Sequence, residues 1–336
     1  MTAVLSPSGP PGPPAGAPPD PVRPARPRWP LSARYVLSRL LNAVLAVWAV
    51  LTIVFFAMHL TGNPASLLLP IDASEEEITR LTAALGFADP LPEQYLRFLG
   101  QVLTGEFPDS IRYGGDPVAL VLERLPATLL LGTWGMIIGA SLGLAAGAVA
   151  VFGRNRRLRR VPVSVLTALE AVPSFFLGIV LIAVFGIVLS VLPLRGAGTP
   201  AHLVLPALVI GLALAAPVAR VFRTSLQEGT GAEHVRLAEA KGIGRARVVL
   251  RHIVVNALAP VLNVLGVQAG VVLGGAVVTE AVFGWPGVGQ LATSAIDSRD
   301  FPVVLACVAL IAIGFVLVNL LVDLAAAILD PRGGRR

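Results

Sequence analysis

Six long apolar runs constrain this chain more than any other feature of its sequence. They lie at Tyr35–Leu60, Ala127–Phe152, Val163–Leu192, Leu203–Leu226, Ile253–Val282 and Val303–Leu329. About 20 consecutive apolar residues are enough for a helix to cross the hydrocarbon core of a bilayer. Hydrophobic residues make up 55% of the chain and charged residues 14%, which excludes an ordinary soluble domain. The sequence therefore predicts an all-α membrane protein with six transmembrane helices.

The distribution of basic residues predicts how the chain is oriented. If the N-terminus faces the cytoplasm, twenty of the 26 Arg and Lys side chains lie on the inner side. The remaining six are Arg80, Arg97, Arg112, Arg124, Arg195 and Arg299. Positive residues concentrate in cytoplasmic loops, so we expect a multi-pass membrane protein with both termini in the cytoplasm. Orientation explains the net charge of +6 better than nucleic-acid binding does, because the basic residues are scattered over several loops.

The segments outside the spans are mostly short. Residues 1–33 are rich in Pro, Gly and Ala, a composition that cannot bury a core, so we expect a disordered cytoplasmic tail. No apolar segment with a small-residue cleavage site precedes the first span, and a cleaved signal peptide is not expected. Cys307 is the one cysteine and lies in an apolar run, so it predicts a packing residue and neither a disulfide nor a metal cluster.

The segment between the first two spans, residues 62–125, is the only sizeable piece outside the membrane. Ser74 and Glu77 have the spacing of a capping box, and Pro92 and Pro117 each have the place of a first-turn proline. The sequence therefore predicts a small extracytoplasmic domain of short helices. It serves either as a platform for an external protein or as a cap that packs on the spans, and amphipathic helices alone do not distinguish the two.

A polar and basic segment, residues 227–252, separates the fourth and fifth spans. Thr230 and Glu233 have the spacing of a capping box, and Gly242 has the place of a C-terminal stop, so we expect a helix of about three turns between them. Its apolar stripe consists of Val235, Leu237 and Ala238, and its polar sides carry Glu233, Arg236, Glu239 and Lys241. This helix is short, amphipathic and basic, and it lies on the cytoplasmic side.

The polar segment also carries a family resemblance. Val235-Arg-Leu-Ala-Glu-Ala-Lys-Gly242, Arg251-His252 and Asn256-Ala-Leu-Ala-Pro260 resemble the cytoplasmic coupling loop of ATP-binding-cassette (ABC) importer permeases, above all the dipeptide/oligopeptide/nickel family. Only Ala238 and Gly242 match the broad motif Glu-Ala-Ala-x-x-x-Gly, a departure that the peptide subfamily shares. Further likenesses occur in order at Thr61–Pro64, Asp89–Tyr95, Glu123–Thr128, Glu280–Gly289, Asn319–Asp323 and Leu329–Arg332.

The resemblance implies a fold like that of type I ABC importers and a place in the bacterial plasma (inner) membrane. The domains would be TM1 at 34–61, the outer loop, a permease core at 126–332 and a cytoplasmic tail at 333–336. The chain would be a non-catalytic permease subunit that forms half of a path for di- or oligopeptides. Its partners would be a second homologous permease, giving a heterodimer, two ABC ATPase subunits that bind ATP and Mg²⁺, and an extracytoplasmic substrate-binding protein. Nickel or another small solute remains an alternative cargo.

The resemblance also implies site residues. The residues expected to contact the ATPase and couple the chain to it are Glu233, Val235, Arg236, Leu237, Ala238, Glu239, Lys241 and Gly242. Candidates for the translocation path or a gate are Pro173, Ser174, Phe175, Phe176, Pro217, Glu280, Phe283 and Trp285. The prolines could equally be simple kinks, and Trp285 could merely anchor a span at the headgroup level.

Two further patterns concern the spans themselves. Glycines recur every four residues at Gly135, Gly139, Gly143 and Gly147, and again at Gly266, Gly270 and Gly274. Small residues on one helix face let backbones approach closely, so we expect tight helix packing in preference to a pore lining.

Glu170 and Asp323 are carboxylates near cytoplasmic ends of spans, and we expect each to pair with an inner-face arginine.

Catalytic chemistry is not expected of this chain. A phosphate-binding loop needs Gly-x-x-x-x-Gly-Lys-Ser/Thr, whereas Lys241 is the only lysine and is followed by Gly242-Ile. The four histidines, His59, His202, His234 and His252, lie on separate segments without metal-ligand spacing. A secondary transporter is the rival class, and it would call for ionisable residues near the midplane and for inverted repeats, neither of which is evident.

Overall fold

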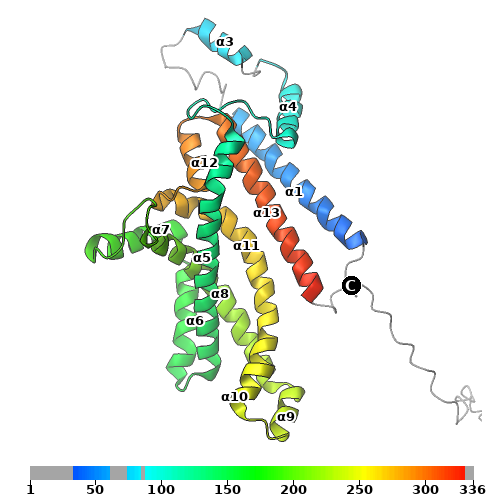
Figure 1. Cartoon of the computed structure of the whole chain (residues 1–336), viewed down its shortest axis with the longest axis vertical. Coiled ribbons are helices and arrows are strands. Elements are labelled where there is room, and N and C mark those ends of the chain that lie inside the picture. Colours follow the sequence, from blue (N-terminus) through cyan, green and yellow to red (C-terminus); the bar gives the residue numbers. More distant parts are fainter. Residues whose placement is uncertain (1–32, 61–73, 85–87, 330–336) are drawn as a thin grey trace, which may run out of the picture.

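A computed structural model describes residues 33–60, 74–84 and 88–329 of the chain. Within these ranges the chain is helical and has no strand, so the predicted all-α class is confirmed (Figure 1). The elements are α1 Ala33–Leu60, α3 Glu75–Ala84, α4 Leu91–Thr104, α5 Pro117–Phe152, α6 Arg156–Glu170, α7 Ser174–Leu181, η1 Ile182–Val188, α8 Ala201–Gly231, α9 Glu233–Ala240, α10 Arg245–Val248, η2 Val249–Val254, α11 Val255–Phe283, α12 Val288–Asp297 and α13 Phe301–Leu329. The expected tails at 1–33 and 333–336 lie outside the described residues, apart from Ala33.

Five stretches of the described chain are long and apolar enough to cross a membrane. They are Leu37–Ala57, Pro117–Phe152, Ala201–Gly231, Arg245–Phe283 and Phe301–Val322. A sixth span exists only if α6 is taken together with the segment Ser174–Val188, and the two are bent by 107°. The expectation of one helix over Val163–Leu192 is therefore wrong. Pro173 explains the break, because a proline disfavours the helical conformation of the residue before it and donates no backbone hydrogen bond.

The first glycine row packs α5 against α8. A Cβ atom on Gly143 would lie 2.6 Å from the Cβ atom of Val218 and 2.7 Å from the carbonyl oxygen of Ala215. A Cβ atom on Gly139 would lie 2.8 Å from the carbonyl oxygen of Gly211. Contacts this short require hydrogen in place of a side chain, so the prediction of tight helix packing is confirmed for this row.

The second glycine row behaves differently along its length. Gly266 and Gly270 on α11 face α13, where added Cβ atoms would collide with Val322 and would lie 2.5 Å from the Nδ2 atom of Asn319. Gly274 has no atom within 4 Å of such a position. Packing thus explains the first two glycines of this row and leaves the third without a packing role.

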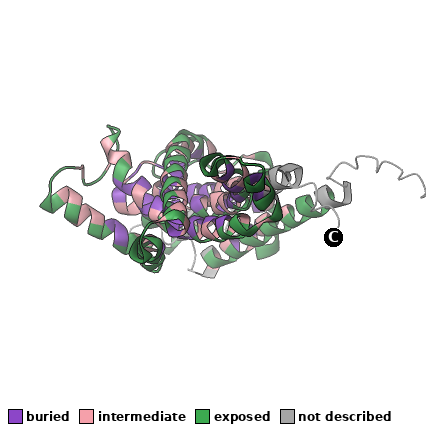
Figure 2. Ribbon diagram, turned by 90° about the horizontal axis from the view of Figure 1, so that it is seen from below, coloured by how far each residue is buried: buried purple, intermediate pink, exposed green. Residues whose placement is uncertain are grey.

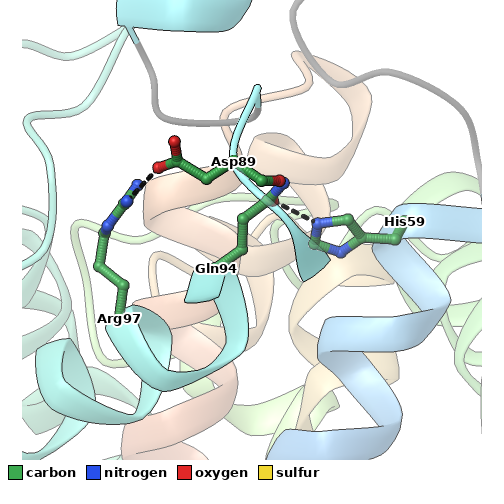
Figure 3. A network of polar contacts seen from close by, with 4 residues as sticks. All are labelled: His59, Asp89, Gln94 and Arg97. Atoms are coloured by element: carbon green, nitrogen blue, oxygen red, sulfur yellow. Dashed lines mark hydrogen bonds and ion pairs between the residues drawn. The ribbon is translucent and has the colours of Figure 1, made fainter. Parts of the chain in front are cut away.

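Helix α4 packs on α1. Phe98 of α4 is buried together with Leu51 and Phe55 of α1, and the Thr52 hydroxyl shares a hydrogen bond of 2.6 Å with the Tyr95 hydroxyl. In Figure 3 the side chains of His59, Gln94, Asp89 and Arg97 form a polar network beside this cluster: the Nε2 atom of His59 lies 2.9 Å from the Oε1 atom of Gln94, and Arg97 pairs with Asp89. One face of α4 therefore packs on α1 as a cap, and a platform role for the loop that contains α4 stays a prediction.

All three helix starts predicted in this loop are confirmed. The backbone N–H of Ser74 donates to Glu77 Oε2 over 3.0 Å, while the N–H of Glu77 donates to the Ser74 hydroxyl over 3.3 Å, which completes the capping box. Helix α4 has Pro92 in its first turn. The third helix begins at Pro117 as predicted, but it is not a separate short helix. It is the first part of α5, which runs without a break to Phe152.

Burial divides the molecule into a packed centre and an apolar outer surface. In the view along the bundle, buried residues gather at the centre and exposed residues lie on the outside (Figure 2). Many large apolar side chains are exposed, including Val44 and Ile53 on α1 and Val267 on α11. A chain whose apolar residues face outward in this number requires lipid or other subunits around it.

Candidate coupling site

Helix α9 lies at the end of the bundle opposite α3 and α4, between α8 and α10 (Figure 1). The predicted capping box at its start is wrong. Thr230 lies inside the last turn of α8, and its hydroxyl donates to the carbonyl oxygen of Gln227 over 2.7 Å. Because α8 continues to Gly231, Thr230 is helical and cannot take the extended backbone that an N-cap residue needs. Ala232 holds that position instead, with φ −69° and ψ 143°.

The predicted stop at Gly242 is confirmed. Gly242 has φ +75°, in the left-handed region that favours glycine. Its N–H donates to the carbonyl oxygen of Glu239 over 2.9 Å, and the N–H of Ile243 donates to that of Ala238 over 3.2 Å. These two hydrogen bonds form a Schellman motif, which ends the helix and satisfies carbonyl groups of its last turn.

Two of the predicted coupling residues face inward. Val235 and Ala238 are buried in an apolar cluster with Phe222 and Leu226 of α8 and with Val248 of α10. They are three residues apart, which places them on one face of a helix with about 3.6 residues per turn. Neither side chain is available to another protein, so their contribution is to hold α9 on the bundle.

The opposite face of α9 is open. Leu237 is 57% exposed, although it belongs to the apolar stripe predicted from the sequence. The other exposed coupling candidates are Glu233, Arg236, Glu239, Lys241 and Gly242. Helix α9 therefore presents one exposed apolar side chain among charged ones.

The path and gate candidates do not form one site. Pro173, Ser174, Phe175 and Phe176 lie at the break between α6 and α7, and both phenylalanines are about half exposed. Phe283 packs beside α7, since a Cβ atom on Gly178 would lie 3.1 Å from its ring. Pro217 lies within α8, which continues through it. The candidates at the start of α7 therefore lie near Phe283 at the end of α11, whereas Pro217 does not belong to this group.

Glu280 is fully buried at the end of α11 and holds the start of α12. Its Oε2 atom accepts hydrogen bonds from the backbone N–H groups of Gly289, over 2.7 Å, and of Gln290, over 3.2 Å. A carboxylate at a helix N-terminus satisfies free N–H groups and is stabilised by the helix dipole. Its Oε1 atom is buried without a hydrogen-bond partner.

The rest of the Glu280–Gly289 motif completes this joint with α5. The indole N–H of Trp285 donates to the carbonyl oxygen of Ala127 over 2.9 Å, and the N–H of Val288 donates to the Thr128 hydroxyl over 2.9 Å. A Cβ atom on Gly287 would collide with the carboxylate of Glu280. Trp285 is only 6% exposed, so its alternative role as an anchor at the headgroup level does not fit. We call this group of residues the outer joint.

The predictions for Glu170 and Asp323 have different outcomes. Glu170 accepts two hydrogen bonds from the guanidinium of Arg220, over 2.5 and 3.1 Å, so its predicted pairing with an arginine is confirmed, while the place of that arginine on the inner face stays a prediction. Asp323 belongs to α13, but its side chain lies outside the described part of the structure. No cluster of three or more His, Cys, Asp or Glu side chains suited to a metal ion occurs in the described ranges.

Sequence reasoning missed a second buried carboxylate, Asp300. Its Oδ2 atom accepts hydrogen bonds from the Ser110 hydroxyl over 2.6 Å and from the backbone N–H of Arg112 over 3.1 Å. These bonds fix the loop before α5 to the turn between α12 and α13. The available signal was local, because an Asp two residues before Pro302 has the pattern of an N-cap at the start of α13.

The chain is similar in sequence to known transport proteins. Residues 139–334 match the family model of the binding-protein-dependent transport system inner membrane component, and residues 32–131 match the model of the N-terminal part of such membrane components. The chain is 36% identical over 299 residues to the glutathione transport system permease protein GsiC of Escherichia coli K12, covering 88% of this chain and 97% of that protein. The same protein of Shigella dysenteriae serotype 1 gives the same values.

Two solved structures are also similar. One is an amino acid ABC transporter with histidines, with 18% identity and a TM-score of 0.49 over 62% of this chain and 93% of that chain. The other is the inward-facing MetNI methionine ABC transporter, with 20% identity and a TM-score of 0.47 over 64% of this chain and 94% of that chain.

Proposed function

This chain belongs to the family of binding-protein-dependent transport system inner membrane components and is a permease subunit of an ABC importer, and we propose that it imports short peptides and is driven through α9. The observation that carries the coupling role is the two-sided packing of α9. Its inward face is buried in the bundle through Val235 and Ala238, whereas Leu237 is exposed on the other face. A helix held in this way transmits a push on its outer face to α8 and α10.

The partners follow from this role. Two ATPase subunits bind ATP and Mg²⁺ and contact the open face of α9, and a second homologous permease supplies the other half of the path. A substrate-binding protein delivers the cargo at the α3 and α4 end. This chain itself is non-catalytic and holds no cofactor. The sequence supports this division, because its only lysine, Lys241, is not part of a phosphate-binding loop.

The orientation is part of the same proposal. Figure 1 places α9 and α10 at one end of the bundle and α3 and α4 at the other. Helix α6 begins with Arg156 at the α9 end, next to Arg154, and α10 carries Arg245 and Arg247 there. Since basic residues mark the cytoplasmic side, the α9 end and both termini lie in the cytoplasm of a bacterial cell.

The substrate class rests on a relative. The GsiC protein of Escherichia coli is named for glutathione transport, and glutathione is itself a short peptide. We extend that chemistry to this chain and place the candidate path near the break between α6 and α7, where Phe175 and Phe176 are exposed. Nickel or another small solute is the alternative cargo within the same architecture.

Uptake by reconstituted vesicles tests this function. The chain is co-assembled with its permease, ATPase and binding-protein partners, and entry of labelled glutathione, a labelled dipeptide and Ni²⁺ is compared with and without ATP. We expect ATP-dependent entry of one or both peptides and no phosphate release by the chain alone. ATP-dependent entry of Ni²⁺ alone would replace the peptide proposal. Uptake driven by an ion gradient without the ATPase subunits would instead indicate a secondary transporter.

A further inference from the structure

A basic hollow lies beside α9, at the point where α10 and η2 lead into α11. Its volume is about 690 Å³, and it is lined by Gly244, Arg245, Ala246, Arg247, Leu250 and Arg251. All three arginines are exposed. Among the side chains that the structure describes, no carboxylate forms an ion pair with any of them. The hollow therefore concentrates positive charge without an internal counter-ion.

An apolar surface continues from this hollow along the span. Leu250 in its lining is 66% exposed, and Val255 and Leu262, farther along the same continuous helix, are 58% and 51% exposed. Arg251 is also the last arginine or lysine before residues 253–279, which contain no Asp, Glu, Lys or Arg. A charged group at the edge of such a run lies at the membrane interface. The hollow thus combines headgroup-level charge with acyl-chain-level apolar surface.

We propose that this hollow binds the phosphate of an anionic phospholipid from the leaflet at the α9 end. A guanidinium is planar and forms paired hydrogen bonds with phosphate oxygens, so Arg247 and Arg251 are suited to the headgroup. The exposed row of Leu250, Val255 and Leu262 is suited to its acyl chains. This second feature favours a lipid over free phosphate, because a soluble anion uses no apolar surface. The inference requires only that the chain lies in a bilayer and goes beyond the proposed function.

Lipid retention tests the proposal. The purified full-length chain is titrated in mild detergent with dioleoyl phosphatidylglycerol or dioleoyl phosphatidylcholine, and retained lipid is counted by native mass spectrometry. We expect phosphatidylglycerol to be retained about tenfold more tightly than phosphatidylcholine. In R247Q/R251Q its binding weakens by about 30-fold, the effect expected of two arginines near an anionic surface. The matched control is R156Q/R157Q, which changes two exposed arginines outside the hollow and keeps the wild-type preference.

Other results would overturn the proposal. Equal retention of the two lipids, or an unchanged preference in R247Q/R251Q, would remove the site. Displacement of phosphatidylglycerol by excess inorganic phosphate would identify a soluble anion as the ligand. Release of the lipid when ATPase subunits are added would show that a protein occupies the hollow. If R247Q/R251Q is not monodisperse, R247K/R251K keeps both charges, and under the proposal it retains the phosphatidylglycerol preference.

Discussion

Leu237 and Ala238 are neighbours in sequence, but only Ala238 faces the bundle. Ala238 is 6% exposed and Leu237 is 57% exposed. Successive residues of a helix are rotated by about 100°, so two adjacent positions can lie on either side of a packing boundary. Substitutions at these two positions therefore separate the docking role of α9 from its attachment to the bundle.

Leu237→Glu is expected to abolish ATP-dependent uptake while leaving the free energy of unfolding within about 0.5 kcal/mol of wild type, because the side chain is exposed. Ala238→Glu is expected to lose uptake for a different reason. It places a charge in an apolar cluster at a cost of several kcal/mol and detaches α9 from α8. Uptake and thermal unfolding of the same preparations distinguish the two. Wild-type uptake by Leu237→Glu would contradict the docking role.

Gly242→Val is expected to uncouple uptake from ATP hydrolysis. No atom lies within 4 Å of an added Cβ, so the penalty arises from the left-handed backbone, about 1–2 kcal/mol for a residue other than glycine. The end of α9 would then shift. Gly244→Ala is the matched control, because Gly244 also has open space but has φ −56°. The ratio of solute imported to ATP hydrolysed should fall in the first variant and stay unchanged in the second.

At the scale of elements, the outer joint links α11, α12 and α5 through buried polar groups. Glu280 holds the first turn of α12, and Trp285 and Val288 bond to Ala127 and Thr128 of α5. Buried polar networks of this kind fix a unique arrangement when their members are paired. The motif at Glu280–Gly289 is thus a structural connection between helices, and any gating at this end would have to move it as a unit.

Gly287→Ala is expected to destabilise the chain by about 1–3 kcal/mol, the usual cost of overpacking, because its Cβ would meet the Glu280 carboxylate. Gly274→Ala is the control. It lies in α11 with no atom within 4 Å, and alanine is favoured over glycine in a helix by up to about 1 kcal/mol. Thermal unfolding in detergent should show a lower midpoint for the first variant and an equal or higher one for the second. Equal midpoints would contradict the contact described for the outer joint.

The elements show which features were readable from sequence. Three helix boundaries were predicted correctly: the stop of α9 at Gly242 and the starts of α3 at Ser74 and of α4 at Pro92. They depend on local hydrogen bonds and on proline geometry, which the sequence shows directly. Thr230 was assigned wrongly because packing extends α8 past it, a tertiary effect that a capping pattern does not contain. Pro173 was visible as a helix breaker, but the 107° bend it permits depends on neighbouring helices. The apolar stripe of α9 predicted the burial of Val235 and Ala238, but the exposure of Leu237 depends on where α8 and α10 lie.

At the scale of the whole molecule, α11 connects the two ends. It is continuous with α10 and η2 beside α9 and ends at Phe283, about one turn after Glu280 of the outer joint. The α3 and α4 end and the α9 end lie on opposite sides of the bundle (Figure 1). Orientation in the membrane therefore decides which end meets ATP and which meets the cargo.

Cysteine labelling tests this orientation. Ser74, directly before α3, and Ala246, in α10, are both exposed, and α3 and α10 lie at opposite ends of the molecule. With the native cysteine Cys307 buried, Cys307→Ala gives a background for single-cysteine variants. A thiol reagent that cannot cross membranes should label Ser74→Cys in intact cells and Ala246→Cys only after permeabilisation. The reverse pattern would invert the topology and place α9 outside.

Site-specific photo-crosslinking from α9 tests the central claim most directly. A photoreactive amino acid replaces Leu237 in the assembled importer, and the control carries it at Leu103, which is 87% exposed on α4 at the opposite end. Irradiation followed by mass spectrometry identifies the subunit that each position contacts. The account predicts an adduct with an ATPase subunit from position 237 and none from position 103. An ATPase adduct from position 103, or its absence from position 237 in a complex that still hydrolyses ATP, would contradict coupling through α9.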